Sequence, residues 1–261
     1  MSYSPFYILF LSMNIATLTY ILGALFYGLP IPVYGVKKWG PRMISDAIYA
    51  GVWINIYGLI IVLANELQNL LGVNWSIFYT YLTNLEAQAF YLMFELKSIY
   101  YTLVNIKAAA AAPVFIPLLQ FSSFISDIVF LLQFIIDIGE FVQNSFMILI
   151  AIGILLLSLP FRIGKGIGGS LISSSIVFYI GLPYLPIFMQ NIYSPPTQLQ
   201  YIPVSDLNVV IETIVGLVPS LVMAFIIIPI IYISILAGLS IGLGNAIGGS
   251  GGKIPFPIDL F

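Results

Sequence analysis

Long apolar stretches, separated by short clusters of charged, proline and glycine residues, make up most of the sequence. A helix that crosses a bilayer needs roughly 20 mostly apolar residues, and cutting the chain at those clusters leaves about seven such stretches. The predicted spans are residues 6–30, 44–71, 77–106, two within 108–160, 170–189 and 209–243. The pattern therefore predicts an all-α, polytopic membrane protein with about seven transmembrane helices.

The two spans within residues 108–160 are inferred from length. This stretch has no basic side chain after residue 107 and before residue 161, and at roughly 1.5 Å per residue it is too long for a single crossing. Its segment DIGEFVQN combines two carboxylates, a glycine and two amides. A turn is therefore predicted near residues 137–144.

Residues 77–106 admit two interpretations. The segment is rich in aromatic residues and more polar than the other spans, because it carries Glu86, Glu95 and Lys97. It can cross the bilayer, or it can lie on the membrane surface as an amphipathic helix. The second interpretation leaves six spans.

The composition points to lipid as the main solvent of this chain. Hydrophobic residues make up 61% of it, charged residues only 7%, and the mean hydropathy is +1.08. Soluble domains typically carry about 25% charged residues, so a soluble fold could not cover this much apolar surface. The sequence predicts one integral membrane domain over residues 1–261, with a flexible cytoplasmic tail, rich in glycine and proline, at residues 244–261.

The basic residues predict the orientation of the chain in the cell membrane. With seven spans, all but Lys97 fall on one side, namely Lys37, Lys38, Arg42, Lys107, Arg162, Lys165 and Lys253. Basic residues in short loops favour the cytoplasmic side. The amino terminus is therefore expected outside and the carboxyl terminus in the cytoplasm.

The chain contains no cysteine and no histidine. These absences exclude disulfides and thiolate metal sites, and they remove the commonest general base and zinc ligand. Carboxylates alone remain for metal or proton chemistry, and no three of them fall at one depth. We therefore predict no enzymatic activity, no catalytic residue, no metal and no cofactor.

Charges inside the predicted spans are the candidate functional residues, because each costs several kcal/mol in hydrocarbon unless it is paired or hydrated. The deepest are Glu86, Glu95, Lys97 and Asp127. Lys97 and Asp127 lie at similar depths and can form a buried ion pair, or Glu86 and Asp127 can line a polar path. Asp46 lies near a span end, where interfacial water is expected to reach it.

Small residues predict close helix packing at two places. Gly164 and Gly168, in a glycine-rich turn, allow the approach of a neighbouring helix. In the last span, Ala237, Gly238 and Gly242, with Ser240 between them, are expected to form one small face.

Residues 159–186, LPFRIGKGIGGSLISSSIVFYIGLPYLP, carry a distinctive pattern. A basic, glycine-rich turn at Arg162 and Lys165 leads into a serine-rich helix start at Ser170 to Ser175, and a Leu-Pro break follows at Leu182. This pattern resembles the CedA family of the crenarchaeal DNA-exchange (Ced) system. More broadly, it is similar to the inner-membrane channel subunits of type IV secretion and conjugation machines.

The resemblance implies a membrane conduit for DNA, the transported substrate, between cells. It also implies a separate cytoplasmic translocation ATPase, and assembly with copies of this chain or with small membrane or pilin-like subunits. A cytoplasmic basic patch is then expected to contact phosphates, and its members are Lys37, Lys38, Arg42, Arg162 and Lys165.

Two other functions remain open from the residues themselves. A secondary transporter for a small solute requires a closed cavity containing Glu86 or Asp127. A membrane scaffold for a surface pilus requires neither a cavity nor a polar path.

Overall fold

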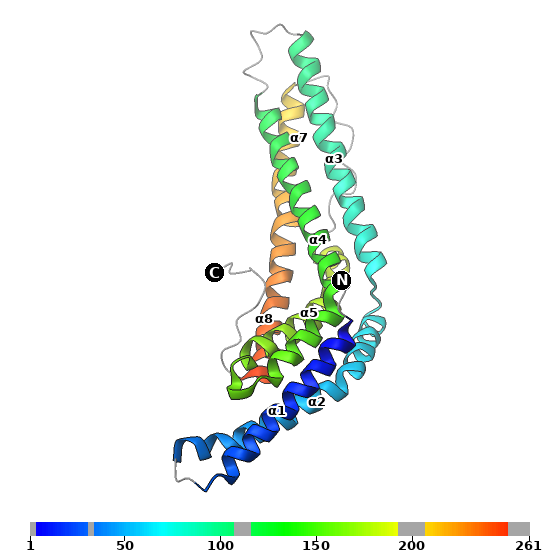
Figure 1. Cartoon of the computed structure of the whole chain (residues 1–261). Helices are drawn as coiled ribbons and strands as arrows, with labels where there is room; N and C mark the ends of the chain where they lie inside the picture. The colour runs from blue at the N-terminus through cyan, green and yellow to red at the C-terminus, as the bar shows by residue number, and fades with distance from the viewer. Residues whose placement is uncertain (1–3, 31–33, 107–115, 193–206, 250–261) are drawn as a thin grey trace. The chain divides into compact units, whose positions relative to one another are not determined.

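The computed structural model describes residues 4–30, 34–106, 116–192 and 207–249, and within them the chain is helical and has no strand (Figure 1). The all-α prediction is therefore confirmed. The helices are α1 (Pro5–Gly28), α2 (Tyr34–Leu70), α3 (Trp75–Ile106), α4 (Ile116–Ser158), α5 (Lys165–Gly181), α6 (Leu185–Ile192), α7 (Leu207–Val222) and α8 (Ile228–Gly248). Short 3-10 turns at Pro160–Arg162 and Leu182–Tyr184 and a π turn at Met223–Ile227 join neighbouring helices.

Five helical stretches within the described residues are long and apolar enough to cross a membrane. They are Pro5–Gly28, Lys37–Leu70, Ile116–Ser158, Lys165–Ile192 and Gly216–Gly248. The segment predicted at residues 77–106 is helical as α3 but is not among the five. The expected seven spans thus become five, or six if α3 also crosses.

The turn predicted near residues 137–144 is absent, because α4 runs unbroken through it for 43 residues. Gln133 donates a hydrogen bond of 2.7 Å to Asp137 one helical turn later, which supports the helix. Gly139 does not break the helix either. A Cβ there would lie 2.5 Å from the ring of Phe78, so this glycine allows α3 to pack closely against α4.

The predicted spans 6–30 and 44–71 imply a break around Gly40 and Pro41, but α2 starts at Tyr34 and continues through both residues. Gly40 serves the crossing with α1. A Cβ on it would lie 2.8 Å from the backbone nitrogen of Tyr27 and 2.9 Å from the carbonyl oxygen of Gly23. Gly40 therefore permits a tight α1–α2 crossing, and Pro41 does not end the helix.

The last predicted span, residues 209–243, contains Pro219 and Pro229, which are expected to kink a helix, and it corresponds to α7, the π turn and α8. Pro229 has no backbone N–H to donate to the carbonyl of Phe225, and a π turn is one way in which a helix accommodates such a loss. α7 continues through Pro219 without a break, so the prediction is confirmed only beside Pro229, where the π turn ends two residues earlier.

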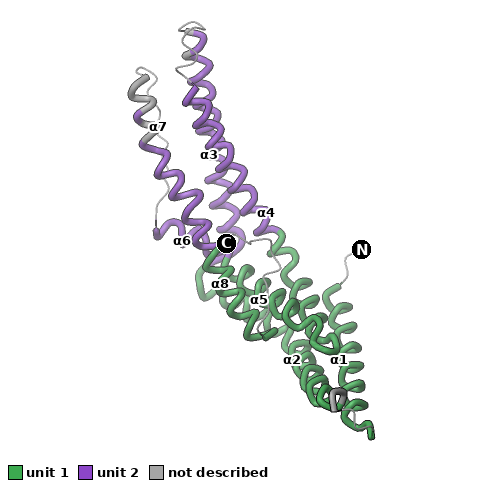
Figure 2. Tube along the Cα trace, turned by 90° about the vertical axis from the view of Figure 1, so that its left-hand side faces the viewer, with its two compact units in different colours: residues 1–72, 141–181, 234–261 green, residues 73–140, 182–233 purple. Residues whose placement is uncertain are grey.

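The chain divides into two compact units (Figure 2). Unit 1 comprises residues 1–72, 141–181 and 234–261, and unit 2 comprises residues 73–140 and 182–233. The sequence alone suggested one domain over residues 1–261. Of the expected tail at 244–261, the residues up to Gly248 belong to α8, and residues 250–261 lie outside the described part.

Unit 1 contains α1, α2, the end of α4, α5 and the end of α8. Hydrogen bonds between helices tie these segments together: Thr19 donates to the carbonyl of Ser158 (2.9 Å), and Tyr49 donates to the carbonyl of Ile247 (3.1 Å). At the opposite end, the amide of Gln68 donates to the carbonyl of Tyr179. Buried side-chain donors thus find partners within the protein, as a lipid environment requires.

Close glycine contacts complete unit 1. A Cβ on Gly169 of α5 would lie 2.6 Å from the Cα atom of Gly248, and one on Gly153 of α4 would lie 2.9 Å from the carbonyl oxygen of Gly168. The predicted role of Gly168 in close packing is confirmed. On α8 the packing face is Ala237, Ser240 and Gly244, whereas the predicted Gly238 and Gly242 face open space.

Unit 2 has a core of its own between α3 and the first part of α4. Phe78, Leu82, Leu96, Ile125 and Leu132 are all 1% exposed or less. The rings of Phe188 and Tyr232 pack 4.7 Å apart between α6 and the start of α8.

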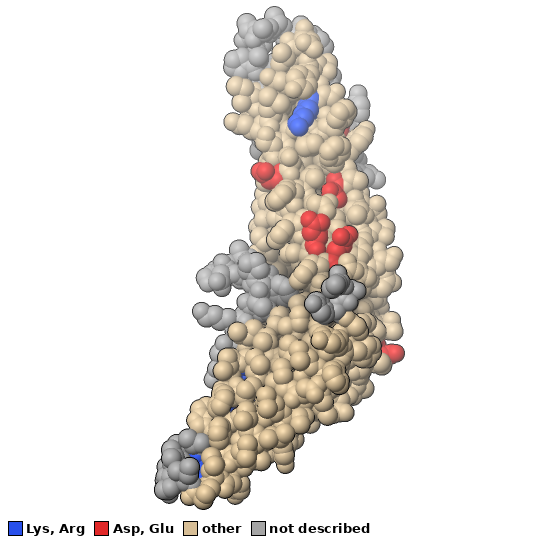
Figure 3. All heavy atoms as spheres, in the orientation of Figure 1, with Lys and Arg blue, Asp and Glu red and all other residues tan. Residues whose placement is uncertain are grey.

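The two units carry opposite charge. Unit 2 contains two basic residues, Lys97 and Lys107, against seven acidic ones, Glu86, Glu95, Asp127, Asp137, Glu140, Asp206 and Glu212. Unit 1 contains six basic residues and three acidic ones, the latter being Asp46, Glu66 and Asp259. Figure 3 shows acidic side chains gathered over α3 and α4.

We predict that Gly169→Ala lowers the stability of the protein and that Gly242→Ala does not. The first change forces a methyl group against the backbone of Gly248, and overpacking of this kind typically costs about 1–3 kcal/mol. The second adds a methyl group in open space, where alanine favours a helix over glycine by roughly 0.5–1 kcal/mol. Thermal unfolding of the two variants in the same detergent checks this. Equal unfolding temperatures would contradict the close α5–α8 contact.

Candidate functional site

A buried carboxylate bridges two cations at one end of unit 1. The Oδ2 atom of Asp46 accepts a hydrogen bond of 2.7 Å from Nε of Arg162, and its Oδ1 atom accepts one of 3.1 Å from Nη2. Nζ of Lys165 donates a third, of 3.0 Å, to Oδ1. The Asp46 side chain is 11% exposed. The expectation that Asp46 simply reaches interfacial water was therefore wrong.

The turn between α4 and α5 brings Arg162 to this carboxylate. Phe161 and Arg162 both have a left-handed backbone, with φ of 61° and 62°, which is unfavourable for residues other than glycine. Three contacts hold the turn. The Phe161 ring packs 6.3 Å from that of Phe26 and 6.0 Å from that of Trp39, while Arg162 is fixed by Asp46.

The electrostatic effect of the bridge is mutual stabilisation. The hydrogen bond to Asp46 raises the pKa of Arg162, in opposition to partial burial, and the negative charge of Asp46 raises it further. Lys165 also lies 5.1 Å from the centre of the Tyr49 ring, a favourable cation–π distance.

The predicted basic patch is consequently split into two parts. Arg162 and Lys165 share the charge of one carboxylate. Lys37, Lys38 and Arg42 are exposed and form no ion pair within the described residues, although Arg42 lies 5.9 Å from the centre of the Trp39 ring. Lys107 and Lys253, which completed the orientation argument, lie outside the described residues.

A row of buried hydroxyls continues from this end into unit 1. Ser170 is buried, Ser173 donates to the carbonyl of Ser240 (2.8 Å), and the hydroxyls of Ser174 and Ser240 lie 2.7 Å apart. These bonds join α5 to α8 and satisfy the hydroxyls of Ser173 and Ser174. Their role is to hold the two helices together.

The residues predicted as a polar path or a buried pair lie in unit 2, and the structure does not join them. Lys97 and Asp127 are both exposed, and the ion pairs found among the described residues are those of Asp46. The reason is the position of each residue on its helix. Lys97 follows the buried Leu96, and Asp127 precedes the buried Ile128. Neighbouring residues of a helix point about 100° apart, so both charges point away from the packed face.

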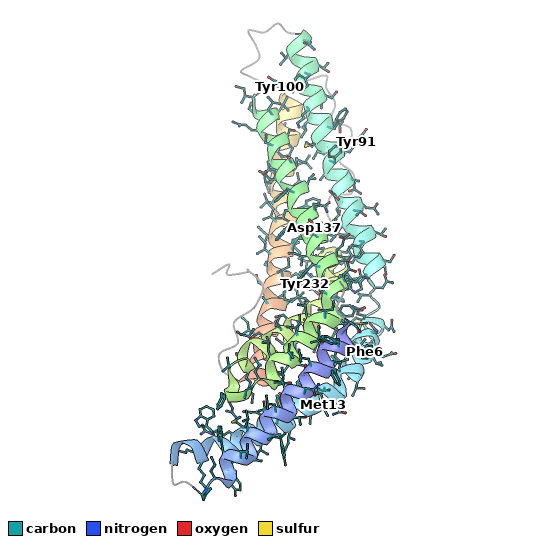
Figure 4. The ribbon with its side chains drawn as sticks, in the orientation of Figure 1. Phe6, Met13, Tyr91, Tyr100, Asp137 and Tyr232 are labelled. Atoms are coloured by element: carbon teal, nitrogen blue, oxygen red, sulfur yellow. The ribbon has the colours of Figure 1, made fainter. Side chains whose placement is uncertain are left out.

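Glu86 and Glu95 are half-buried. Glu86 lines an open depression of about 460 Å³ on one face of α3, together with aromatic residues such as Phe90 and Tyr91. Tyr91 is 71% exposed and projects outward from the helix (Figure 4). All the residues that line this depression belong to α3, so it is a surface feature of that helix rather than a path.

Metal binding finds no support in the part of the chain that the structure describes. No group of three or more acidic side chains there is arranged to hold a metal ion.

Comparison with known proteins decides the family. A family profile described as "DNA import protein CedA1" matches residues 1–70, which contain the α1–α2 hairpin. The chain is 41% identical, over 99% of its length, to the "DNA import protein CedA" of Sulfolobus acidocaldarius, of which it also covers 99%. It belongs to the CedA family. No solved structure matches the chain.

Several residues of the segment by which the sequence resembles the CedA family make structural contacts. Its Arg162 and Lys165 bind Asp46, its Gly168 and Gly169 allow close helix contacts, and its serines bond α5 to α8. The segment therefore organises the packing of unit 1.

Sequence reasoning missed Asp46, although a signal existed. Asp46 is the first acidic residue of the chain and follows Arg42 by one helical turn. The basic residues already placed the turn at Arg162 on the same side of the membrane as Lys37 and Lys38. Asp46 lies on that side as well, so the turn at Arg162 offered it a basic partner.

We predict that Asp46 and Arg162 are energetically coupled. Asp46→Ala leaves two cations close together without a counter-charge, and we expect it to destabilise the protein by about 1–3 kcal/mol, below the full value for a buried pair because Arg162 is 45% exposed. Arg162→Ala added to Asp46→Ala should cost little more. A double-mutant cycle of thermal unfolding measures the coupling. Arg42→Ala is the control, and strictly additive effects would show that the bridge contributes nothing.

Proposed function

We propose that this chain is the polytopic membrane component of a DNA import machine and that it forms, with other subunits, the conduit through which DNA crosses the cell membrane. The observation that carries the proposal is its 41% identity to a DNA import protein over 99% of both chains. Similarity over the whole length means that the complete arrangement of helices is shared, not one portable segment. The chain would then serve the same process.

The conduit is proposed to form between chains rather than inside one unit. The cavity enclosed in unit 2 by residues such as Ala89, Ile125 and Phe225 has a volume of only about 10 Å³, roughly the space of one water molecule. The depression beside Glu86 is open and lies on a single helix. Neither suits a solute chamber, which speaks against the transporter hypothesis, and neither admits a nucleic-acid strand. Copies of this chain, or small membrane or pilin-like subunits, would complete the path.

Energy for transport is proposed to come from a separate cytoplasmic ATPase. No catalytic step is assigned to this chain, since histidine and cysteine are absent and the described carboxylates do not converge on a site. Its role would be that of a membrane-embedded passage.

The orientation proposed for this role places the amino terminus outside. The five described basic residues of unit 1 lie near the start of α2 and near the turn between α4 and α5. These two places are at the same end of the unit, because Asp46 of α2 binds Arg162 and Lys165. The start of α1 lies at the opposite end of its antiparallel hairpin with α2, and the end of α8 contacts the basic end through Tyr49. The positive-inside rule then puts the carboxyl terminus in the cytoplasm.

Cysteine labelling tests this orientation, and the absence of native cysteine makes it simple. We expect Ser4→Cys to react with an impermeant maleimide in intact cells. Lys38→Cys, which is also exposed, should react only after the cells are permeabilised. The reverse pattern would invert the proposed topology.

The functional test is deletion of the gene in one of two genetically marked strains that exchange chromosomal markers. If the chain serves import, deletion in the recipient should abolish acquisition of markers, whereas deletion in the donor should leave it intact. Complementation with the intact chain or with Gly242→Ala should restore exchange. Unchanged marker acquisition by the deleted recipient would refute the proposal.

A further inference from the structure

The α1–α2 hairpin carries an apolar groove near its turn. The groove has a volume of about 390 Å³ and is lined by Tyr27 of α1 and by Pro41, Ile44, Ser45 and Ile48 of α2. It is formed by unit 1 alone. Ser45 contributes the one aliphatic hydroxyl among otherwise hydrocarbon and aromatic walls.

Two lysines stand at one end of this groove. Residues four and seven apart lie on the same face of a helix, and Pro41 and Ile44 follow Lys37 at these spacings. Lys38 precedes Pro41 by three residues and Ser45 by seven, so it flanks the same face. Both lysines are exposed and have no ion pair within the described residues.

The other basic residues of unit 1 that the structure describes are accounted for. Arg162 and Lys165 bind Asp46, and Arg42 lies against Trp39. Lys37 and Lys38 also lie in the first turns of α2, where no acidic residue occurs and where the helix dipole disfavours positive charge. An anion placed at these two lysines would therefore relieve repulsion that the protein itself leaves uncompensated.

We propose that the groove binds an anionic membrane lipid, with its headgroup phosphate at Lys37 and Lys38 and one hydrocarbon chain along Pro41 to Ile48. That stretch of α2 extends about 10 Å at 1.5 Å per residue, which suits part of a lipid chain. Free phosphate or nucleic acid would leave the apolar groove unfilled, and a neutral lipid would leave the lysines unpaired. The inference does not depend on the DNA import role.

The test uses the full-length protein, purified in detergent and depleted of lipid. Its thermal unfolding is followed in mixed micelles that contain phosphatidylglycerol or phosphatidylcholine with identical acyl chains. We expect phosphatidylglycerol to raise the apparent Tm more than phosphatidylcholine. Native mass spectrometry of the same samples should show a retained phosphatidylglycerol molecule.

Three variants assign the effect to this groove. Lys37→Gln combined with Lys38→Gln should reduce the preference for phosphatidylglycerol at least twofold. Ser45→Trp, which fills the groove and keeps both lysines, should also reduce it. Lys97→Gln, which removes another exposed lysine on α3, should leave it unchanged. If Ser45→Trp fails to fold, the lysine variants and the mass spectrometry of the unmodified protein still decide.

Several outcomes would overturn the proposal. Equal stabilisation by the two lipids would mean that no anionic headgroup is recognised. If glycerol phosphate raised the apparent Tm as much as phosphatidylglycerol does, and did so equally in Ser45→Trp, the lysines would be assigned to a free phosphate. Displacement of phosphatidylglycerol from the unmodified protein by a single-stranded oligonucleotide would assign the two lysines to nucleic acid.

Discussion

The arrangement of unit 1 depends on one buried carboxylate. Asp46 lies on α2, while its partners Arg162 and Lys165 lie on the turn and helix that follow α4. An unpaired charge at this position would be costly in an apolar environment, and three charges that satisfy one another through directed hydrogen bonds are not. The bridge also fixes which ends of the helices meet. From that register follow the bond from Thr19 to Ser158 and the contact of Tyr49 with the end of α8.

Around this bridge, small residues determine how closely the helices approach. In lipid, apolar side chains gain little by leaving one hydrocarbon environment for another, so packing between backbones and hydrogen bonds between helices carry association. Gly169 against Gly248, and Ser173 and Ser174 against Ser240, show both effects on a single pair of helices. The strained turn at Phe161 and Arg162 is tolerated because ring contacts and the ion pair hold it.

The same bridge sorts the basic residues into two groups with different chemistry. Arg162 and Lys165 are committed to a structural role by Asp46, whereas Lys37 and Lys38 remain available to an external anion. Both lysines lie in the hairpin of α1 and α2. This is also the region that the CedA1 family profile matches. Family membership and electrostatics thus draw attention to one hairpin by independent routes.

The sequence by itself determined the fold class, the approximate limits of α1 and α3, and the family, because these follow from local hydrophobic runs and from a contiguous segment, residues 159–186. It could not determine whether Gly139 or Pro41 ends a helix. In sequence, a glycine that breaks a helix looks the same as Gly139, which makes room for the ring of Phe78. Nor could it separate the paired cations from the free ones, or show that Lys97 and Asp127 face away from the packed core. Those outcomes depend on the rotation of each helix about its axis and on contacts between residues more than 100 positions apart, such as Asp46 and Arg162. Only the tertiary structure decides them.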